Sequence, residues 1–145
     1  MITRNVQETK DIAKRIGEKI NQKTIILLKG DLGAGKTTFT QGLAQGLGIT
    51  KTVSSPTFTI MKVYHGRLPL YHIDAYRLEG IHQDLGFEDQ LEEEAVCVIE
   101  WPDYIMDILP SEYLVITISY LSEHEREITC CAYGSYYEML IEDIK

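Results

Sequence analysis

The first third of the chain carries a helical pattern of apolar residues, then a strand-like run, then a second helical pattern. Apolar side chains at helical spacing follow the capping pair Asn5 and Glu8, and they predict a first helix: Ile12, Ala13, Ile16 and Ile20. The continuous apolar run at 24–29 predicts a buried strand. A helical stripe over 36–47, followed by Gly48 as a stop, predicts a second helix.

The middle of the chain alternates between strand patterns and polar segments. Residues 57–64 and 68–73 both have strand patterns and are separated by a short turn, so they predict a β-hairpin. The acidic stretch 81–94 has few apolar positions and predicts short surface helices. The run 95–100 is apolar and predicts a buried strand that ends on Glu100.

The C-terminal third completes the predicted fold. Pro102 is typical of the first position of a helix, here one that would run to residue 109. Clear alternation over 112–120 and 125–132 predicts an antiparallel pair near the edge of a sheet, and 135–144 is weakly helical. These elements predict one α/β domain over residues 1–145, with a parallel central sheet, antiparallel flanking strands and helices on both faces.

Composition and charge narrow the class of protein. The 145 residues are 44% hydrophobic and 25% charged, as in an ordinary globular domain. A net charge of −8 suits a nucleic-acid backbone poorly, so we expect any RNA to be held by another protein. No apolar stretch reaches the roughly 18 residues of a membrane span, so we expect a cytoplasmic protein without a membrane partner. The chain has three cysteines, Cys97, Cys130 and Cys131. Because an odd number argues against a disulfide framework, we expect buried, reduced thiols.

The segment between the first strand and the second helix carries the strongest chemical signal. Residues Gly30–Thr37 match the pattern Gly-x-x-x-x-Gly-Lys-Thr in the strand–loop–helix setting that a phosphate-binding loop requires. Glycines let backbone N–H groups curl around phosphate oxygens, Lys36 supplies a positive charge, and the Thr37 hydroxyl suits Mg²⁺. We therefore predict a P-loop NTPase fold that binds the nucleotide through Asp31, Gly33, Ala34, Gly35, Lys36, Thr37 and Thr38.

Two carboxylates follow apolar strands, where a metal bound to phosphate needs ligands. Asp74 ends the run 70–73, and Glu100 ends the run 96–99. Both would lie at the carboxyl ends of strands, where open α/β sheets bind ligands. Mg²⁺ prefers one or two carboxylates together with hydroxyl, water and phosphate oxygens. We therefore expect Thr37, Asp74 and Glu100 to serve the metal.

Several neighbouring residues keep two interpretations. His72 either supports the site or is a packed core residue, and the second is favoured. Arg77 pairs either with phosphate or with an acidic side chain. Thr57 is the candidate for sensing the γ-phosphate, with a capped strand start as the alternative. Trp101 belongs to the core or to the site. The start of the first helix and the strand that carries Arg126 are candidate walls of a base pocket.

Four motifs together resemble one known family. The segments Gly30–Phe39, Ser55–Phe58, His72–Leu78 and Ile99–Pro102 resemble the TsaE family, also called YjeE, in their order and spacing. The resemblance covers essentially the whole chain. Members of that family are small bacterial cytosolic ATPases that support formation of N6-threonylcarbamoyladenosine on the tRNA adenosine next to the anticodon. They act with TsaD, which transfers the threonylcarbamoyl group, and with TsaB.

The resemblance implies ATP and Mg²⁺ as cofactors, and TsaD and TsaB as the partners that hold the tRNA. It implies that Lys36 contacts the phosphates and that Thr37 and Glu100 hold Mg²⁺. Asp74 then binds the metal directly, binds it through water, or orients the attacking water. Lys36, Asp74 and Glu100 would be the catalytic residues of an ATPase that is slow alone and is activated by its partners.

Other functional classes fit the sequence less well. A small-molecule kinase of the P-loop class would need an acceptor site and usually a cationic lid. The five arginines do not cluster, and no insertion is long enough for a lid domain. A GTP-dependent switch would carry Asn-Lys-x-Asp, which the sequence lacks. A nucleotide-gated binding module with little turnover alone overlaps with the resemblance, and the kinase stays as the alternative.

Overall fold

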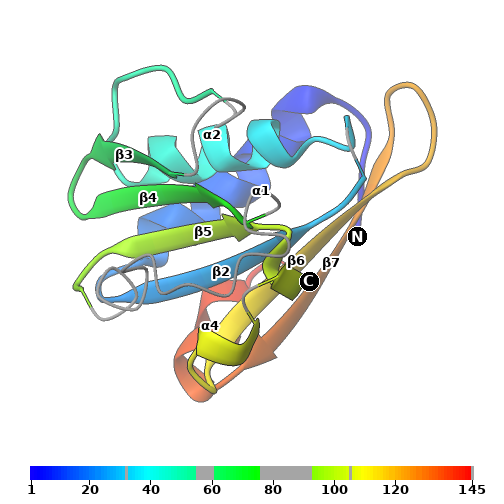
Figure 1. Cartoon of the computed structure of the whole chain (residues 1–145). Coiled ribbons are helices and arrows are strands. Elements are labelled where there is room, and N and C mark those ends of the chain that lie inside the picture. The colour runs from blue at the N-terminus through cyan, green and yellow to red at the C-terminus, as the bar shows by residue number, and fades with distance from the viewer. Residues whose placement is uncertain (32, 55–60, 76–92, 105, 145) are drawn as a thin grey trace.

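A single mixed sheet organises the chain. The computed structural model describes residues 1–31, 33–54, 61–75, 93–104 and 106–144. Within them the sheet has seven strands in the order β1-β7-β6-β2-β5-β4-β3 (Figure 1). The strands are β1 Ile2–Thr3, β2 Thr24–Lys29, β3 Met61–His65, β4 Pro69–Asp74, β5 Val96–Glu100, β6 Tyr113–Tyr120 and β7 Arg126–Tyr133.

The centre of this sheet is parallel and its two sides are antiparallel. β2 lies between β5 and β6 and runs parallel to both, and β4 runs parallel to β5. On one side β3 pairs antiparallel with β4, and on the other β7 pairs antiparallel with β6. The short β1 then pairs with the outer edge of β7. The predicted parallel centre and both predicted antiparallel pairs are confirmed.

The described α-helices cover one face of the sheet. They are α1 Val6–Lys19, α2 Lys36–Gly46 and α4 Ser135–Ile141, and Figure 1 shows α1 and α2 side by side. One core cluster joins their apolar side chains to alternate strand residues such as Ile26 and Leu28. The opposite face carries Ile25 and Leu27 and meets Ile108. Within the described residues the α-helices thus lie on one face and a 3₁₀ helix, η3 Met106–Ile108, packs on the other, while residues 76–92 lie outside the described part, so the prediction of helices on both faces stays a prediction.

Two predicted segments differ from the structure or lie partly outside it. Pro102 begins a 3₁₀ helix, η2 Pro102–Tyr104, which is followed by η3 Met106–Ile108 instead of one continuous helix. Runs of 3₁₀ helix stay short because their hydrogen-bond geometry is poorer. Strand β3 begins at Met61, and residues 55–60 of that region lie outside the described part, as does most of the acidic stretch, 81–92.

The three cysteines differ in burial. Cys97 in β5 is buried, whereas Cys130 and Cys131 in β7 are half-buried and exposed. Burial raises the pKa of the Cys97 thiol to about 12, so this thiol stays protonated at neutral pH. The prediction of a buried thiol is right for Cys97 and wrong for Cys131, because successive residues of β7 point to opposite faces of the sheet.

α1 and α2 approach closely along the C-terminal half of α2. A Cβ atom added at Gly42 would lie 2.4 Å from the carbonyl oxygen of Lys10, and one at Gly46 would lie 2.4 Å from that of Lys14. Since real Cβ atoms do not approach backbone so closely, glycine is needed where the two helices touch.

Arg67, in the turn between β3 and β4, ties the C-terminal ends of α1 and α2 together. Its guanidinium donates to the carbonyl oxygens of Ile20, Gly17 and Gly46 at 3.0, 2.9 and 2.9 Å. A cation at helix C-termini is favourable. We expect Arg67→Ala to lower the free energy of unfolding by about 2 kcal/mol in urea denaturation. Arg15→Ala, at an exposed position of α1, should change it by less than about 0.5 kcal/mol, and equal effects would contradict this role.

Candidate functional site

The loop between β2 and α2 has a backbone conformation that requires its glycines. Gly30, Gly33 and Gly35 have φ angles of 154°, 81° and 113°, which L side chains rarely adopt. A Cβ at Gly30 would also lie 2.6 Å from the carbonyl oxygen of Ile118. Gly35 is the N-cap of α2, and no side chain caps this helix end. The first N–H groups of α2 are therefore suited to receive an external anion.

Lys36, the first residue of α2, is buried with its charge close to three other groups. Its side chain is only 7% exposed, and Nζ donates to the carbonyl oxygen of Gly30 at 2.8 Å. The same Nζ lies 3.7 Å from Oε1 of Glu100 and 4.3 Å from the ring centroid of Trp101. A buried ammonium needs such partners because desolvation of a lone charge is costly.

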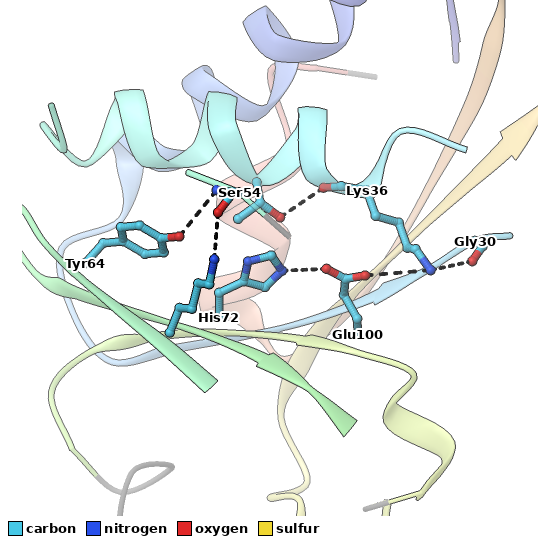
Figure 2. A network of polar contacts seen from close by, with 8 residues as sticks. Gly30, Lys36, Ser54, Tyr64, His72 and Glu100 are labelled. Carbon is cyan, nitrogen blue, oxygen red and sulfur yellow. Dashed lines mark hydrogen bonds and ion pairs between the residues drawn. The ribbon is translucent and has the colours of Figure 1, made fainter. Parts of the chain in front are cut away.

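Glu100 is the last residue of β5, and its carboxylate contacts both Lys36, which follows the glycine loop, and His72 of β4. Figure 2 shows one row of contacts that runs from Gly30 through Lys36 and Glu100 to His72. Oε2 of Glu100 lies 2.5 Å from Nε2 of His72, while Oε1 faces Lys36. The Glu100 side chain is 8% exposed, so its carboxylate is held by partners on both sides in a largely water-free setting.

His72 lies in β4 on the helix-covered face of the sheet. The residue is fully buried, as expected for a packed core residue. It is also hydrogen-bonded to Glu100, so the contact that a supporting role would need is present as well. Its second ring nitrogen, Nδ1, is buried and has no hydrogen-bond partner among the described residues.

Asp74 and Glu100 occupy equivalent positions at the ends of adjacent strands. They are register partners in the parallel pair β4–β5, so both side chains point to the face on which α2 lies. Asp74 is half-buried, and Thr37 and Thr38 lie in the first turn of α2. The strand-end placement predicted for both acids is confirmed. Thr57 and Arg77 lie outside the described residues.

The side chains of Thr37, Asp74 and Glu100 suit a metal only in combination with other oxygen donors. Among the described residues, no group of three or more His, Cys, Asp or Glu side chains is arranged to hold a metal ion. The hydroxyl of Thr37 and the carboxylates of Asp74 and Glu100 are the hard oxygen ligands that Mg²⁺ prefers. Mg²⁺ usually completes its shell with water and phosphate oxygens, so the donor set fits a metal that arrives with a phosphate ligand.

A cavity of about 490 Å³ opens beside the glycine loop. It is bounded by the start of α1, the loop, the first turn of α2 and the β6–β7 connection, and its lining comprises Asn5, Val6, Gln7, Thr9, Gly33, Gly35, Thr38, Glu123, His124 and Arg126. The two walls suggested by the sequence therefore both line this cavity. Glu123 and His124 were not predicted, because the sequence indicates a turn at these residues but not that the turn lies beside the glycine loop.

Arg126, at the start of β7, connects that hairpin to the loop. Its Nε donates to the carbonyl oxygen of Ala34 at 3.0 Å, and its Nη1 donates to that of Ser122 at 2.7 Å. The guanidinium also stacks over the ring of Tyr120, 4.6 Å from its centroid. These contacts set the width of the cavity by holding the hairpin against the loop.

Trp101 directly follows β5 and contacts the cation at the start of α2. It is half-buried, its ring lies against Lys36, and its φ of 57° places a non-glycine residue in the left-handed region. Such backbone strain is kept only where surrounding contacts enforce it. Here the strained residue directly follows Glu100 and turns the chain from β5 into η2.

The sequence profile of a family described as "Threonylcarbamoyl adenosine biosynthesis protein TsaE" matches residues 3–128 of this chain. The chain belongs to the TsaE family. The matched residues include the whole arrangement described above, from Asn5 to Arg126. Among the described residues of this TsaE-family chain, no helix has the length and apolar character needed to cross a membrane.

Curated TsaE relatives match over most of their length. A protein of Bacillus subtilis (strain 168) named "tRNA threonylcarbamoyladenosine biosynthesis protein TsaE" is 50% identical over 143 residues, which cover 98% of this chain and 90% of that protein. A protein of the same name from Treponema pallidum (strain Nichols) is 41% identical over 130 residues, covering 88% and 96%. The crystal structure of Bacillus subtilus YdiB superposes with a TM-score of 0.82 at 45% identity, covering 99% of this chain and 90% of that one.

Proposed function

We propose that this TsaE-family chain is a P-loop ATPase that binds ATP with Mg²⁺. Its role would be to support formation of N6-threonylcarbamoyladenosine on tRNA, together with TsaD and TsaB in the cytoplasm. The names of its relatives support the tRNA-modification role. The observation that carries the ATPase proposal is the buried Lys36–Glu100 pair directly beside the glycine loop and the uncapped start of α2. Cation, carboxylate and open N–H groups converge there, as phosphoryl transfer requires.

The glycine loop, the start of α2 and Lys36 would bind the phosphates. Backbone N–H groups at the uncapped helix end would donate to phosphate oxygens. Lys36 is now held by the Gly30 carbonyl and by Glu100, and it would exchange these contacts for phosphate oxygens. Because the site is largely dry, the charge of Lys36 acts more strongly there than it would in water.

Thr37, Glu100 and Asp74 would hold the metal. Mg²⁺, when bound, neutralises negative charge on the phosphate oxygens. The Thr37 hydroxyl lies on α2, and the two carboxylates approach from adjacent strand ends, so three separate elements would fix one ion. Asp74 either contacts the metal, contacts it through water, or orients the attacking water.

The cavity of about 490 Å³ beside the loop would receive the nucleoside. It adjoins Gly33, Gly35 and Thr38, so a ligand with phosphates on the loop would extend into it. Asn5, Gln7 and other polar residues in its lining offer hydrogen bonds to a base or a ribose.

We expect slow turnover in isolation, and the contacts of Arg67 and Arg126 support this expectation. Arginine fingers stabilise the transition state of phosphoryl transfer. Arg67 donates to the helix ends, and Arg126 donates to backbone carbonyls of the loop and the hairpin. Neither guanidinium could move onto the phosphates without breaking these bonds, which favours a partner as the source of an arginine finger.

Reconstitution of tRNA modification tests the proposal. Purified TsaB and TsaD would be supplied with tRNA, ATP and the substrates of the modification, with and without this chain. We expect multiple turnovers only with the wild-type chain, and a single round or less with Lys36→Ala or Glu100→Ala. Equal multi-turnover product from every mixture would refute the role. ATP-dependent phosphorylation of a metabolite without any partner would favour the kinase alternative.

A further inference from the structure

We propose that His72 is a positioning residue that holds Glu100 in the orientation needed for the metal; this inference rests on the proposed function. The contact joins two strands and residues 28 positions apart in sequence. His72 precedes Asp74 by two residues in β4, so both face α2, and Asp74 is the register partner of Glu100. The imidazole therefore lies beside the Glu100 carboxylate on the same face of the sheet.

A short hydrogen bond joins His72 to Glu100. Nε2 of His72 and Oε2 of Glu100 lie 2.5 Å apart, so a proton lies between them. A carboxylate that binds a metal is ionised and can only accept, so in the proposed metal-bound site Nε2 is the donor. The other nitrogen, Nδ1, is buried without a partner among the described residues.

The consequence for Glu100 follows from where its two oxygens point. His72 holds Oε2, which fixes the plane of the carboxylate and leaves Oε1 towards Lys36 and the glycine loop. When Lys36 moves to phosphate, the buried carboxylate keeps one charge-assisted hydrogen bond. Without His72, Lys36 would be the only described side chain that holds the Glu100 carboxylate by a hydrogen bond or ion pair, so the carboxylate could turn towards Lys36 and away from the metal.

Three substitutions separate positioning from packing. His72→Leu fills the space without a donor. His72→Gln places an amide nitrogen the same number of bonds from Cα as Nε2, whereas His72→Asn places one at the position of Nδ1. Tyr71→Phe is the matched control, because Tyr71 is the neighbouring residue of β4, packs on the opposite face and bonds Glu93.

The measurement is the affinity for ATP at a series of Mg²⁺ concentrations and in EDTA, by titration calorimetry. Mg²⁺ should increase the affinity for ATP. We expect His72→Leu and His72→Asn to raise the Mg²⁺ concentration that gives half of this increase by about 10-fold to 100-fold. ATP affinity in EDTA should stay within about threefold. His72→Gln and Tyr71→Phe should resemble the wild type.

Each outcome decides a different point. An unchanged Mg²⁺ requirement in folded His72→Leu would overturn the inference and leave the proposed function intact. If His72→Leu does not fold, as judged by circular dichroism, the comparison of His72→Gln with His72→Asn decides, and equal behaviour of these two overturns the inference. No ATP binding by the wild-type chain under any condition would overturn the proposed function itself, and with it this inference.

Discussion

Replacing Lys36 with alanine is expected to weaken ATP binding by at least roughly 100-fold, which corresponds to about 3 kcal/mol. Lys36 is the cation that lies between the Gly30 carbonyl and Glu100 at the start of α2. Its removal takes away the charge that would meet the phosphates. It also leaves the buried Glu100 carboxylate without its cation, so the site becomes more repulsive to an anion. Titration calorimetry with ATP and Mg²⁺ measures the loss.

The control for this prediction is Lys29→Ala. Lys29 ends β2, next to the glycine loop, and its side chain is 40% exposed with an ion pair to Asp103 at 3.7 Å. Exposed pairs of this kind contribute little, so this variant should bind ATP within about threefold of the wild type. If both lysine variants lose affinity equally, general electrostatic attraction accounts for binding, and the specific role of Lys36 is wrong.

Glu100→Gln is expected to reduce ATP turnover by about 100-fold or more while ATP still binds in EDTA. The substitution keeps the shape of the side chain but removes the negative charge that a metal ligand needs. It also removes the partner of Lys36, so the lysine would be more available to phosphate and metal-free ATP affinity should stay equal or increase. Phosphate release under saturating ATP and Mg²⁺, with TsaB and TsaD present, measures turnover.

Glu93→Gln is the matched control for this second prediction. Glu93 precedes the other end of β5, and its carboxylate accepts a hydrogen bond from the Tyr71 hydroxyl on the exposed surface. It should leave turnover within about twofold of the wild type. Normal Mg²⁺-dependent turnover by Glu100→Gln would show that Glu100 is not a metal ligand, and Asp74 would then be the residue to substitute next.

Local features of the site were predictable because they depend on residues close together in the sequence. The glycines at 30, 33 and 35 and the strand and helix on either side indicated a sharp loop, and these glycines do have positive φ angles. Asp74 and Glu100 each follow an apolar run, so their position at strand ends could be predicted. That they are register partners required the strand order, which no local pattern contains.

Predictions failed where the environment of an element decides its form. Pro102 suggested one continuous helix, but the structure has two short 3₁₀ helices there. They follow the strained turn at Trp101, and Ile108 of the second packs against the sheet. Alternation in β7 indicated two faces, but it could not show that one of them would leave Cys131 exposed. Periodicity reports the direction of a side chain, not what will cover it.

The amino-acid sequence by itself determined the glycine loop, its cation, the two strand-end acids and the antiparallel pairs, because backbone conformation and side-chain direction act over a few residues. Only the tertiary structure decided that His72 is hydrogen-bonded to Glu100, and that Arg126 reaches the carbonyl of Ala34, 92 positions away. Those contacts depend on which strands become neighbours and on the packing of α1 against α2, and burial of the whole apolar core selects both.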